Sequence, residues 1–511
     1  MSDVRGLLSG NTHFSWQGFE TRVARATSGF AQLGVGEGGT VALLMRNDPA
    51  FLEANLAAVR RGAYAVPINW HATPDEIAYI LKDSGAGVLV AHADLWRRAA
   101  DAIPPATTVL LAPPPPEVAS AYGLAEEEFN LPPGALPWHD WVEAQVPSRD
   151  AAPAPCESMI YTSGTTGVPK GVRRFRPTGD QLAALRELRA RVYGIVPGMR
   201  VLVPGPLYHS APNSYALNAV AMGGLVVLMP RFDAEAFLAL VERHHVTHTF
   251  MVPTMFARLL KLPERQRRRY DVSSLECVVH AAAPCPDHVK EAMIDWWGEV
   301  LVEFYGATEI GPVTLCGSAE WLARRGTVGR AVESAEIKVL DDDGRELPAG
   351  NAGELFVRVH AYPDFTYQNQ PEERRRVESN GLISVGDVGY LDNAGYLYLC
   401  DRKRDMIISG GVNIYPAEIE AALLALPGVG DCAVFGIPDA EFGESVMAVV
   451  APAHGAALLP DALLAALAAR VADYKLPRRI EIRSELPRED SGKIRKRALR
   501  DPYWEKTGRK I

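Results

Sequence analysis

The sequence predicts an α/β protein with a large N-terminal domain of layered parallel sheets and helices, a β-subdomain, and a small α+β C-terminal domain. Helical and strand-like segments alternate over residues 14–110, short strand-like segments with Asp-Asp-Gly turns occupy about 330–400, and a compact mixed pattern follows. Alternating strands and helices are typical of parallel sheets with helices on both faces. We therefore expect one domain at 1–403, with its β-subdomain at about 330–400, and a second at 404–511.

The N-terminal elements follow from the spacing of apolar residues. Residues 21–34 (TRVARATSGFAQLG) have helical spacing and end in glycine, whereas 40–47 (TVALLMRN) form a short apolar strand. Residues 50–69 indicate a helix followed by a strand, and the proline-rich segment 112–119 (APPPPEVA) is expected to be a loop. The alternation resumes through RVLVPGPLYHS, GGLVVLMP and HTFMVPTMF.

The C-terminal region combines helix and strand patterns after residues 401–411 (DRKRDMIISGG). Residues 418–426 (EIEAALLAL) predict a helix, 431–439 (DCAVFGIPD) a strand, and 461–474 (DALLAALAARVADY) a second helix. A domain boundary near Arg404 separates this pattern from the β-rich segments before it.

Composition excludes several classes of protein. The 511 residues are 48% hydrophobic and 23% charged, with a net charge of −9, which argues against a broad nucleic-acid surface. The basic run at 265–269 (RQRRR) is expected to be a solvated helix end. No run of about 18 apolar residues and no signal-peptide core are present, so we expect no stable membrane insertion and a cytoplasmic location. The six cysteines form no CxxC pair and fit reduced thiols.

The stretch YTSGTTGVPKGV (161–172) has the composition of a phosphate-binding loop but not the Walker pattern, because Lys170 follows proline and precedes glycine. Small residues let backbone N–H groups approach phosphate oxygens, hydroxyls add donors, and a lysine adds a point charge. A glycine-rich surface turn is the alternative.

Three further segments carry polar residues in unusual settings. In EFYGATEIG (303–311), the Thr308–Glu309 pair could hold Mg²⁺ against a triphosphate, or could cap a strand end. In SVGDVGYLD (384–392), Asp387 could accept hydrogen bonds from both ribose hydroxyls, with Arg402 reaching the same sugar, or could cap a hairpin turn. In LPREDSGKIRKRAL (486–499), Lys493 lies in a glycine-containing turn, where a solvated tail is the alternative.

Taken together and in this order, these motifs resemble the adenylate-forming superfamily of acyl- and aryl-CoA synthetases, amino-acid adenylation domains and luciferases. The resemblance covers roughly residues 14–500 and is greatest to bacterial acyl-CoA synthetases. It implies that ATP and a carboxylate form an acyl-adenylate and pyrophosphate, and that coenzyme A then takes the acyl group. Because such an enzyme mainly positions reactants and neutralises charge, ATP, Mg²⁺ and coenzyme A are the expected cofactors.

The resemblance assigns a role to each matching residue. Lys493 would bridge the acyl carboxylate and the α-phosphate, Glu309 would help hold Mg²⁺, and Thr308 would contact phosphate. Tyr305 would stack on adenine, and Asp387 and Arg402 would bind ribose. The remaining nucleotide contacts would come from the phosphate loop, the adenine segment and the strand end at Thr162, Ser163, Gly164, Thr165, Thr166, Gly167, Lys170, Ala282, Ala283, Pro284 and Gly306.

For thioester formation, the resemblance implies that a mobile C-terminal domain swings about a hinge at Arg404 and removes the lysine from the site. Gly410 and Gly411 would border the pantetheine passage, where a side chain would block the thiol. Arg173, Arg174 and Arg176 follow the phosphate loop and could bind phosphates of coenzyme A, but surface charge is the favoured interpretation.

The acyl pocket is expected beside PLYHSAPNSY (206–215), VPTMF (252–256) and HAAAPCP (280–286). Amino-acid adenylators carry an Asp near the position of His209, and its absence argues for a plain carboxylic acid. His209 could gate entry of the thiol or could simply pack. Small residues leave room for a bulky medium-chain, aromatic or alicyclic acid. The pocket residues we expect are Tyr208, His209, Ser210, Asn213, Pro253, Thr254, Ala282 and Ala307.

Other functions stay open at this point. A stand-alone enzyme that loads a carrier protein is the main alternative, and the final acceptor decides between the two. A luciferase-like oxygenase is less favoured, because most members of the superfamily do not oxidise their substrates. A nucleotide-sensing protein without turnover is less favoured, because the complete set of charged motif residues indicates catalysis. The expected partners are a small carboxylic acid, ATP and coenzyme A, with no nucleic acid, while a carrier protein and a homodimer stay open.

Overall fold

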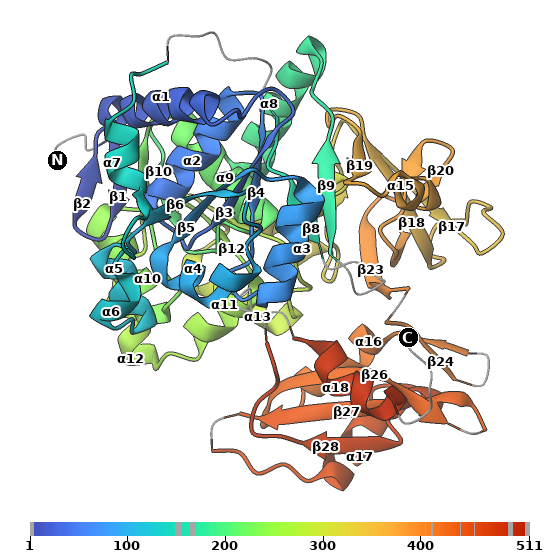
Figure 1. Cartoon of the computed structure of the whole chain (residues 1–511). Coiled ribbons are helices and arrows are strands. Elements are labelled where there is room, and N and C mark those ends of the chain that lie inside the picture. The colour runs from blue at the N-terminus through green and yellow to red at the C-terminus, as the bar shows by residue number, and fades with distance from the viewer. Residues whose placement is uncertain are drawn as a thin grey trace.

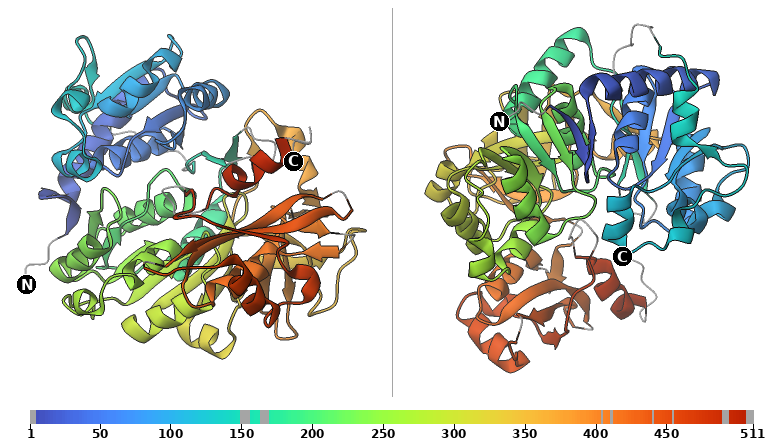
Figure 2. Two further views of the ribbon diagram at one scale, coloured as in Figure 1. Left: turned by 90° about the horizontal axis from the view of Figure 1, so that it is seen from below. Right: turned by 90° about the vertical axis from the view of Figure 1, so that its left-hand side faces the viewer.

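The computed structural model describes residues 5–148, 156–162, 169–403, 405–409, 412–439, 441–453, 455–488 and 494–505. Figure 1 shows a large N-terminal region and a smaller lobe that runs from β24 to α18. The right-hand view of Figure 2 shows the same separation. The predicted α/β class is confirmed by the parallel sheets and helices described below.

A nine-stranded sheet forms the centre of the N-terminal region. Its strand order is β16-β15-β14-β13-β12-β10-β11-β1-β2, and the strands from β14 to β1 are parallel, whereas β15, β16 and β2 pair antiparallel. The strands are β1 (Gly6–Ser9), β2 (Thr12–Phe14), β10 (Arg200–Val203), β11 (Leu225–Leu228), β12 (His248–Met251), β13 (Cys277–His280), β14 (Leu301–Ala307), β15 (Gly311–Gly317) and β16 (Arg330–Ala331). The helices in this part of the chain are α8 (Gly179–Tyr193), α9 (Ser210–Ala221), α10 (Ala234–His244), α11 (Pro253–Leu260), α12 (Glu264–Arg267), α13 (Asp287–Trp297) and α14 (Ser318–Ala323).

A second, fully parallel sheet has the order β4-β3-β5-β6-β7. Its strands are β3 (Thr40–Leu44), β4 (Tyr64–Pro67), β5 (Val88–His92), β6 (Thr108–Ala112) and β7 (Leu136–Pro137). The helices are α1 (Trp16–Gln32), α2 (Pro49–Arg60), α3 (Pro74–Ser84), α4 (Ala93–Ala99), α5 (Pro116–Tyr122), α6 (Glu126–Phe129) and α7 (Trp138–Glu143), with a 3₁₀ turn at Ala100–Ala102. The segment expected to be a loop at 112–119 is therefore partly helical, because Pro116 starts α5 in a position that proline fits.

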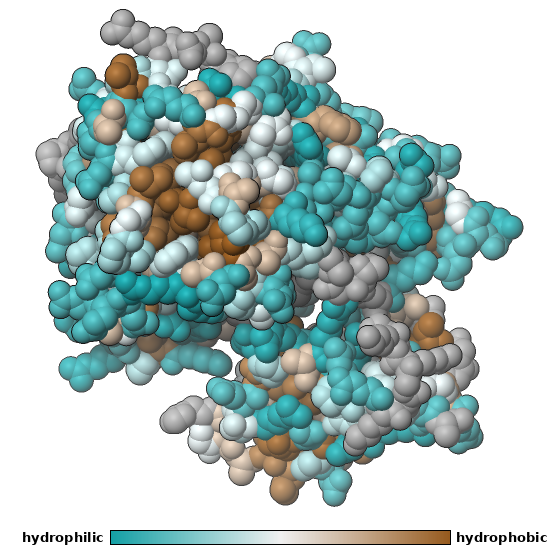
Figure 3. Space-filling view, viewed as in Figure 1, coloured by the Kyte–Doolittle hydropathy of each residue, from teal (hydrophilic) through white to brown (hydrophobic). Residues whose placement is uncertain are grey.

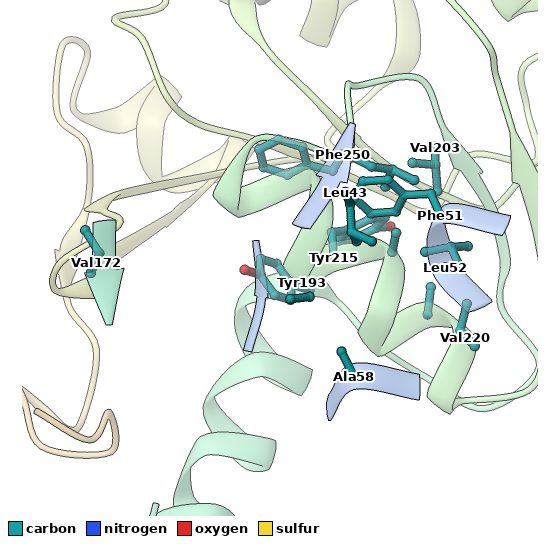
Figure 4. Packing of buried hydrophobic residues seen from close by; sticks show 14 of the residues in the cluster. Leu43, Phe51, Leu52, Ala58, Val172, Tyr193, Val203, Tyr215, Val220 and Phe250 are labelled. Carbon is teal, nitrogen blue, oxygen red and sulfur yellow. The ribbon is translucent and has the colours of Figure 1, made fainter. Parts of the chain in front are cut away.

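The core joins the two sheets through helices of both. Figure 4 shows Leu43 of β3, Phe51 and Leu52 of α2, and Tyr215 and Val220 of α9 gathered in one buried cluster. Every residue of β3 is buried, as expected of a short apolar run in a parallel sheet. This packing fixes the strand ends that carry the polar motifs.

The β-subdomain is a six-stranded sheet of order β20-β21-β18-β22-β23, with β17 on the other side of β18. A three-stranded sheet, β19-β9-β8, links this region to the phosphate-loop hairpin. The elements are β8 (Ile160–Thr162), β9 (Lys170–Arg174), β17 (Ala335–Leu340), β18 (Gly353–Val359), β19 (Phe365–Tyr367), α15 (Pro371–Arg376), β20 (Glu378–Ser379), β21 (Leu382–Ile383), β22 (Asp387–Leu391) and β23 (Leu397–Arg402). On the face seen in Figure 3, hydrophilic residues dominate this region, whereas hydrophobic residues gather on the large N-terminal region.

The C-terminal lobe has a sheet of order β25-β24-β27-β26, with β28 paired to β27. Its elements are β24 (Ile407–Ser409), β25 (Val412–Ile414), α16 (Pro416–Leu424), β26 (Val429–Asp439), β27 (Gly443–Pro452), α17 (Pro460–Ala468), a 3₁₀ turn at Asp473–Lys475, β28 (Arg479–Ile482) and α18 (Lys496–Trp504). The helix expected at 461–474 ends earlier, at Ala468, and Val471 beyond its end packs in the same buried cluster as Leu463 and Leu467. Arg404 lies outside the described residues, so the boundary there stays a prediction.

Candidate active site

Strands β8 and β9 form an antiparallel hairpin that flanks the phosphate-loop motif. Thr162 lies opposite Lys170, while Ser163, Gly164, Thr165, Thr166 and Gly167 lie outside the described residues. The ring of Tyr161 packs against Gly171. A Cβ on Gly171 would lie 2.8 Å from the Tyr161 ring, so this position leaves no room for a side chain. The Tyr161 hydroxyl donates a hydrogen bond to Asp83 Oδ2 at 2.7 Å, which ties the hairpin to α3.

Lys170 begins β9 and is almost fully buried, with 7% of its surface exposed. Its Nζ lies 2.6 Å from Oε2 of Glu373, a residue of α15, and 5.3 Å from the centre of the Tyr367 ring. A buried ammonium needs an anionic or polar partner, and the Glu373 carboxylate supplies one. The motifs did not predict this pairing, because 203 positions separate the two residues.

Thr308 and Glu309 lie in the turn between β14 and β15. Tyr367 donates its hydroxyl hydrogen to Glu309 Oε1 at 3.2 Å. Burial, followed by the charge of Glu309, raises the pKa of Tyr367, so this hydroxyl keeps its proton at neutral pH. Tyr367 therefore contacts both Lys170 and Glu309, which brings the expected phosphate lysine and the expected metal ligand to one place.

Arg174 corrects the expectation that the arginines after the loop are surface charge. Only 6% of it is exposed, its Nη2 donates to the Thr308 carbonyl at 2.6 Å, and its Nη1 donates to the Pro363 carbonyl at 3.1 Å. Its Nε lies 3.2 Å from Glu157 Oε2. Arg174 thus holds the turn that carries Glu309 against the phosphate hairpin.

The two other arginines also contact protein groups. The Arg173 guanidinium lies 4.9 Å from the centre of the Tyr64 ring. Arg176 forms an ion pair with Glu37. Both side chains are more accessible than that of Arg174, so surface charge still describes them in part.

The expected ribose and adenine residues lie next to each other. The Tyr305 hydroxyl, near the end of β14, donates to Asp387 Oδ2 at 2.7 Å, and both residues are buried. Asp387 begins β22 and lies opposite Arg402 of β23 in the strand register, although the Arg402 side chain lies outside the described part. Tyr305 is therefore a direct neighbour of Asp387, a contact that the motifs alone did not reveal.

The neighbouring Gly306 has a structural reason to be glycine. A Cβ on Gly306 would lie 2.2 Å from the carbonyl oxygen of Gly311, so the close approach of β14 and β15 excludes a side chain. A strand irregularity at Tyr305–Gly306 marks the same place. Ala307 follows directly, partly buried, before the Thr308–Glu309 turn.

The expected acyl side surrounds the start of α9. The ring of Tyr208 is buried, lies edge-on to Trp70 at 4.6 Å, and lies 4.3 Å from the ring of His209. Asn213 donates to the Leu207 carbonyl at 3.0 Å, so its amide holds the turn that carries these rings. Ser210 begins α9, and Pro253 and Thr254 begin α11 after a neighbouring parallel strand.

The segment after β13 holds a strained alanine. Ala282 has φ of +76°, a left-handed conformation that favours glycine, and it is exposed together with Pro284, while Ala283 is partly buried. In α13, which follows this segment, Lys290 places its Nζ 2.6 Å from Glu303 Oε2, and both residues are buried. Burial, reinforced by the Lys290 charge, lowers the pKa of His280 well below its ordinary value. The motifs did not point to this buried charged cluster.

The C-terminal motif residues Arg404, Gly410, Gly411 and Lys493 lie outside the described residues. Their neighbours are described: β24 and β25 pair on either side of the two glycines, and Lys496, at the start of α18, lies 2.8 Å from Glu420. The roles of these four residues therefore stay predictions.

Glu309 would offer a metal ion a single carboxylate. Among the described residues, no group of three or more His, Cys, Asp or Glu side chains could hold a metal ion. Mg²⁺ commonly binds through one or two carboxylates together with substrate phosphates, so Glu309, which contacts Tyr367 as Lys170 does, fits such a site. In the same described ranges, no helix is both long and apolar enough to cross a membrane.

Comparison with known proteins gives consistent matches over nearly the whole chain. A family model described as "AMP-binding enzyme" matches residues 3–361, and one described as "AMP-binding enzyme C-terminal domain" matches 418–493. A feruloyl-CoA synthase of an Amycolatopsis species is 34% identical over 497 residues, covering 96% of this chain and 94% of that protein. The fatty acid–[acyl-carrier-protein] ligase ScoC of Streptomyces coeruleorubidus is 32% identical, covering 94% and 89%. The structure of the amide bond synthetase McbA from Marinactinospora thermotolerans superposes with a TM-score of 0.84 at 28% identity, covering 98% and 97%.

Proposed function

Because the chain belongs to the AMP-binding enzyme family, we propose that it is an acyl-CoA synthetase that activates a carboxylic acid with ATP and passes the acyl group to coenzyme A. The observation that best supports this is the set of interactions that joins the four motif residues Lys170, Glu309, Tyr305 and Asp387 into two neighbouring pairs. Tyr367 contacts the first two, and Tyr305 and Asp387 are hydrogen-bonded. This arrangement offers a cation for phosphates, a carboxylate for a metal, and an acceptor for ribose hydroxyls.

In the first half-reaction, a carboxylate oxygen of the acid attacks the α-phosphorus of ATP, and the bond to the pyrophosphate oxygen breaks. The attacking group is already ionised at neutral pH, so no general base is needed. Lys170 and the loop at 163–167 would hold the β- and γ-phosphates, and Asp387 with Arg402 would hold the ribose. Glu309 would hold Mg²⁺, which supplies charge neutralisation when it is bound.

Lys493 is the residue we propose to act at the reacting atoms, where its ammonium would neutralise charge on the acyl carboxylate and the α-phosphate. Lys493→Ala should therefore slow adenylation by roughly a hundredfold or more while ATP affinity changes little. The measurements are pyrophosphate release and calorimetric ATP binding on the same preparation. Equal losses of rate and of ATP affinity would assign Lys493 to ground-state binding instead.

In the second half-reaction, the sulfur of coenzyme A attacks the acyl carbon and AMP leaves. We propose that the C-terminal domain turns about Arg404 between the two steps, that Gly410 and Gly411 border the passage of the thiol, and that His209 gates it. Arg404→Pro should stop thioester formation while adenylation continues, because a fixed φ restricts the hinge. Loss of both steps in equal measure would contradict a hinge at this position.

The acid is proposed to be bulky: aromatic, alicyclic or of medium chain length. The feruloyl-CoA synthase relative favours an aromatic acid. Loading of a separate carrier protein is the second candidate, favoured by the carrier-protein ligase among the relatives. The cytoplasmic location and the homodimer stay predictions.

The decisive experiment measures pyrophosphate release with ATP, Mg²⁺ and a panel of aromatic, alicyclic and medium-chain acids, each with and without coenzyme A. Turnover that depends on coenzyme A with one class of acid would support the synthetase and name its substrate class. Release that stops near one equivalent per enzyme under both conditions would mean that an acyl-adenylate awaits another acceptor. No release with any acid would reject the proposed function.

A further inference from the structure

The ammonium of Lys170 is already neutralised inside the protein. Its Nζ lies 2.6 Å from Oε2 of Glu373, and only 21% of the Glu373 side chain is exposed. Glu373 lies on α15, and β19, which precedes this helix, pairs with β9, which carries Lys170. The backbone N–H of Gln368 also donates to the Gly171 carbonyl at 2.8 Å, so the fold fixes this pairing rather than leaving it to chance contact of long side chains.

The carboxylate remains charged in this setting. The hydrogen bond from Lys170 is the main reason that the pKa of Glu373 is lowered, with the charge of Arg376 contributing further. A negative charge therefore stands beside Lys170 at neutral pH. The β- and γ-phosphates of ATP would meet repulsion from Glu373 at the same ammonium.

From this geometry we propose that Glu373 is a built-in counter-ion, which holds Lys170 in the nucleotide-free enzyme and must release it when the terminal phosphates of ATP bind. The inference rests on the proposed function, because it requires those phosphates to lie at Lys170. Glu373 is then a positioning residue that sets the affinity for ATP and for pyrophosphate. The same carboxylate would recapture Lys170 as pyrophosphate leaves.

A second cation, Arg376, lowers the free-energy cost to Glu373 of losing its ion pair with Lys170. The other carboxylate oxygen of Glu373 forms an ion pair with Arg376, whose side chain is 73% exposed. When Lys170 turns to phosphate, the carboxylate keeps Arg376 and gains water, so it is not left as a buried unpaired charge. Lys170 in turn exchanges one anion for another.

The test compares binding of ATP with Mg²⁺, of inorganic pyrophosphate and of AMP by calorimetry, without any carboxylic acid. Glu373→Gln should lower the Kd for ATP and for pyrophosphate by roughly two- to fivefold, the range expected from a partly exposed ion pair. The Kd for AMP should stay within about twofold, because AMP lacks the terminal phosphates. A general change of surface charge would affect all three ligands.

Glu372→Gln is the matched control. Glu372 is the adjacent residue, its side chain is 67% exposed, and it pairs with Arg375 at 2.8 Å rather than with Lys170. The Glu372→Gln substitution removes the same charge from the same turn of α15 and should leave the Kd values for ATP, pyrophosphate and AMP nearly unchanged. An equal effect of both glutamine variants would reduce the proposal to surface electrostatics and overturn it.

For a second pair of variants the expected change in ATP affinity has the opposite sign, and neither variant alters Lys170 or Glu373 themselves. Arg376→Gln leaves Glu373 to pair with Lys170 alone, so ATP should bind about two- to threefold more weakly than to Arg375→Gln, its exposed control. If Glu373→Gln binds ATP equally or more weakly than wild type, Glu373 orients Lys170 for phosphate and the proposal is wrong. If wild type itself binds no ATP, the proposed function fails, which is a separate outcome.

Discussion

Replacing Arg174 by lysine should keep the positive charge beside the Thr308–Glu309 turn but remove hydrogen bonds that hold this turn in place. Arg174 donates to the carbonyls of Thr308 and Pro363 at 2.6 and 3.1 Å, and it pairs with Glu157 at 3.2 Å. A lysine keeps the charge and one of these interactions but cannot reproduce a planar fork with three partners. The turn that carries Glu309 should then lose its fixed distance from the phosphate hairpin.

The magnitude follows from the hydrogen bonds that lysine cannot replace. A hydrogen bond to a charged group contributes about 1.5–3 kcal/mol, so the absence of two predicts roughly 3–6 kcal/mol of lower unfolding free energy. Burial alone would raise the pKa of Glu157, but the charges of Arg189 and Arg174 together hold it below its ordinary value. Lysine preserves this compensation, whereas Arg174→Ala would leave Glu157 with Arg189 alone and cost about 3–5 kcal/mol.

The assay combines urea unfolding with pyrophosphate release over a Mg²⁺ titration. Arg174→Lys should raise the half-saturating Mg²⁺ concentration about tenfold, since small misplacements of binding groups have large effects on rate. Arg189→Lys is the control, because Arg189 shares Glu157 but bonds to Tyr362 rather than to the Thr308 turn. Should both variants lose stability and shift the Mg²⁺ titration equally, the clamp on the turn would be refuted.

Three further changes have a definite sign. Ala282→Gly should raise the unfolding free energy in urea by about 1 kcal/mol, since φ of +76° strains alanine; a decrease would show that its methyl group packs usefully. Tyr305→Phe removes the 2.7 Å hydrogen bond that holds Asp387 and should weaken AMP binding about five- to tenfold by calorimetry. An unchanged Kd would show that Tyr305 does not position Asp387 for the ribose. Below about pH 6.5, His280 is protonated in the unfolded chain but stays neutral in the folded protein, so its presence lowers the unfolding free energy as the pH falls. His280→Gln should therefore reduce the dependence of the unfolding free energy on pH by about 1.4 kcal/mol per pH unit, measured by urea unfolding at about pH 5–7. An unchanged dependence would assign the acid destabilisation to other groups.

The fold was largely predictable because its signals are local. The run TVALL predicts a buried strand, and β3 occupies Thr40–Leu44 with every residue buried. The α17 helix was predicted too long, because helical spacing of apolar residues continues beyond Ala468, where the helix ends, and includes the buried Val471. The antiparallel strands β15 and β16 were likewise not foreseen at the edge of a parallel sheet.

The site was predictable as a set of motifs but not as a set of contacts. Thr308 and Glu309 could be named from YGATE, yet nothing local indicated that Arg174 would hold their turn, because 134 positions separate Arg174 from Thr308. Charge alone made Arg174 resemble a surface residue. It lies in the interior because the carboxylate of Glu157 and the carbonyls of Thr308 and Pro363 compensate its guanidinium. Contacts of this kind depend on strand pairing between distant segments.

The pairing of β9 with β19 has a consequence for how the nucleotide is bound. This strand pairing places the carbonyl of Pro363 beside Arg174. It also places the ring of Tyr367 and the carboxylate of Glu373 beside Lys170. These two cations of the phosphate hairpin are therefore each matched by groups from one short stretch, residues 363–373. A shift of this stretch would change the charge available to phosphate and the position of Glu309 together, so both should respond to the same substitutions in β19 and α15.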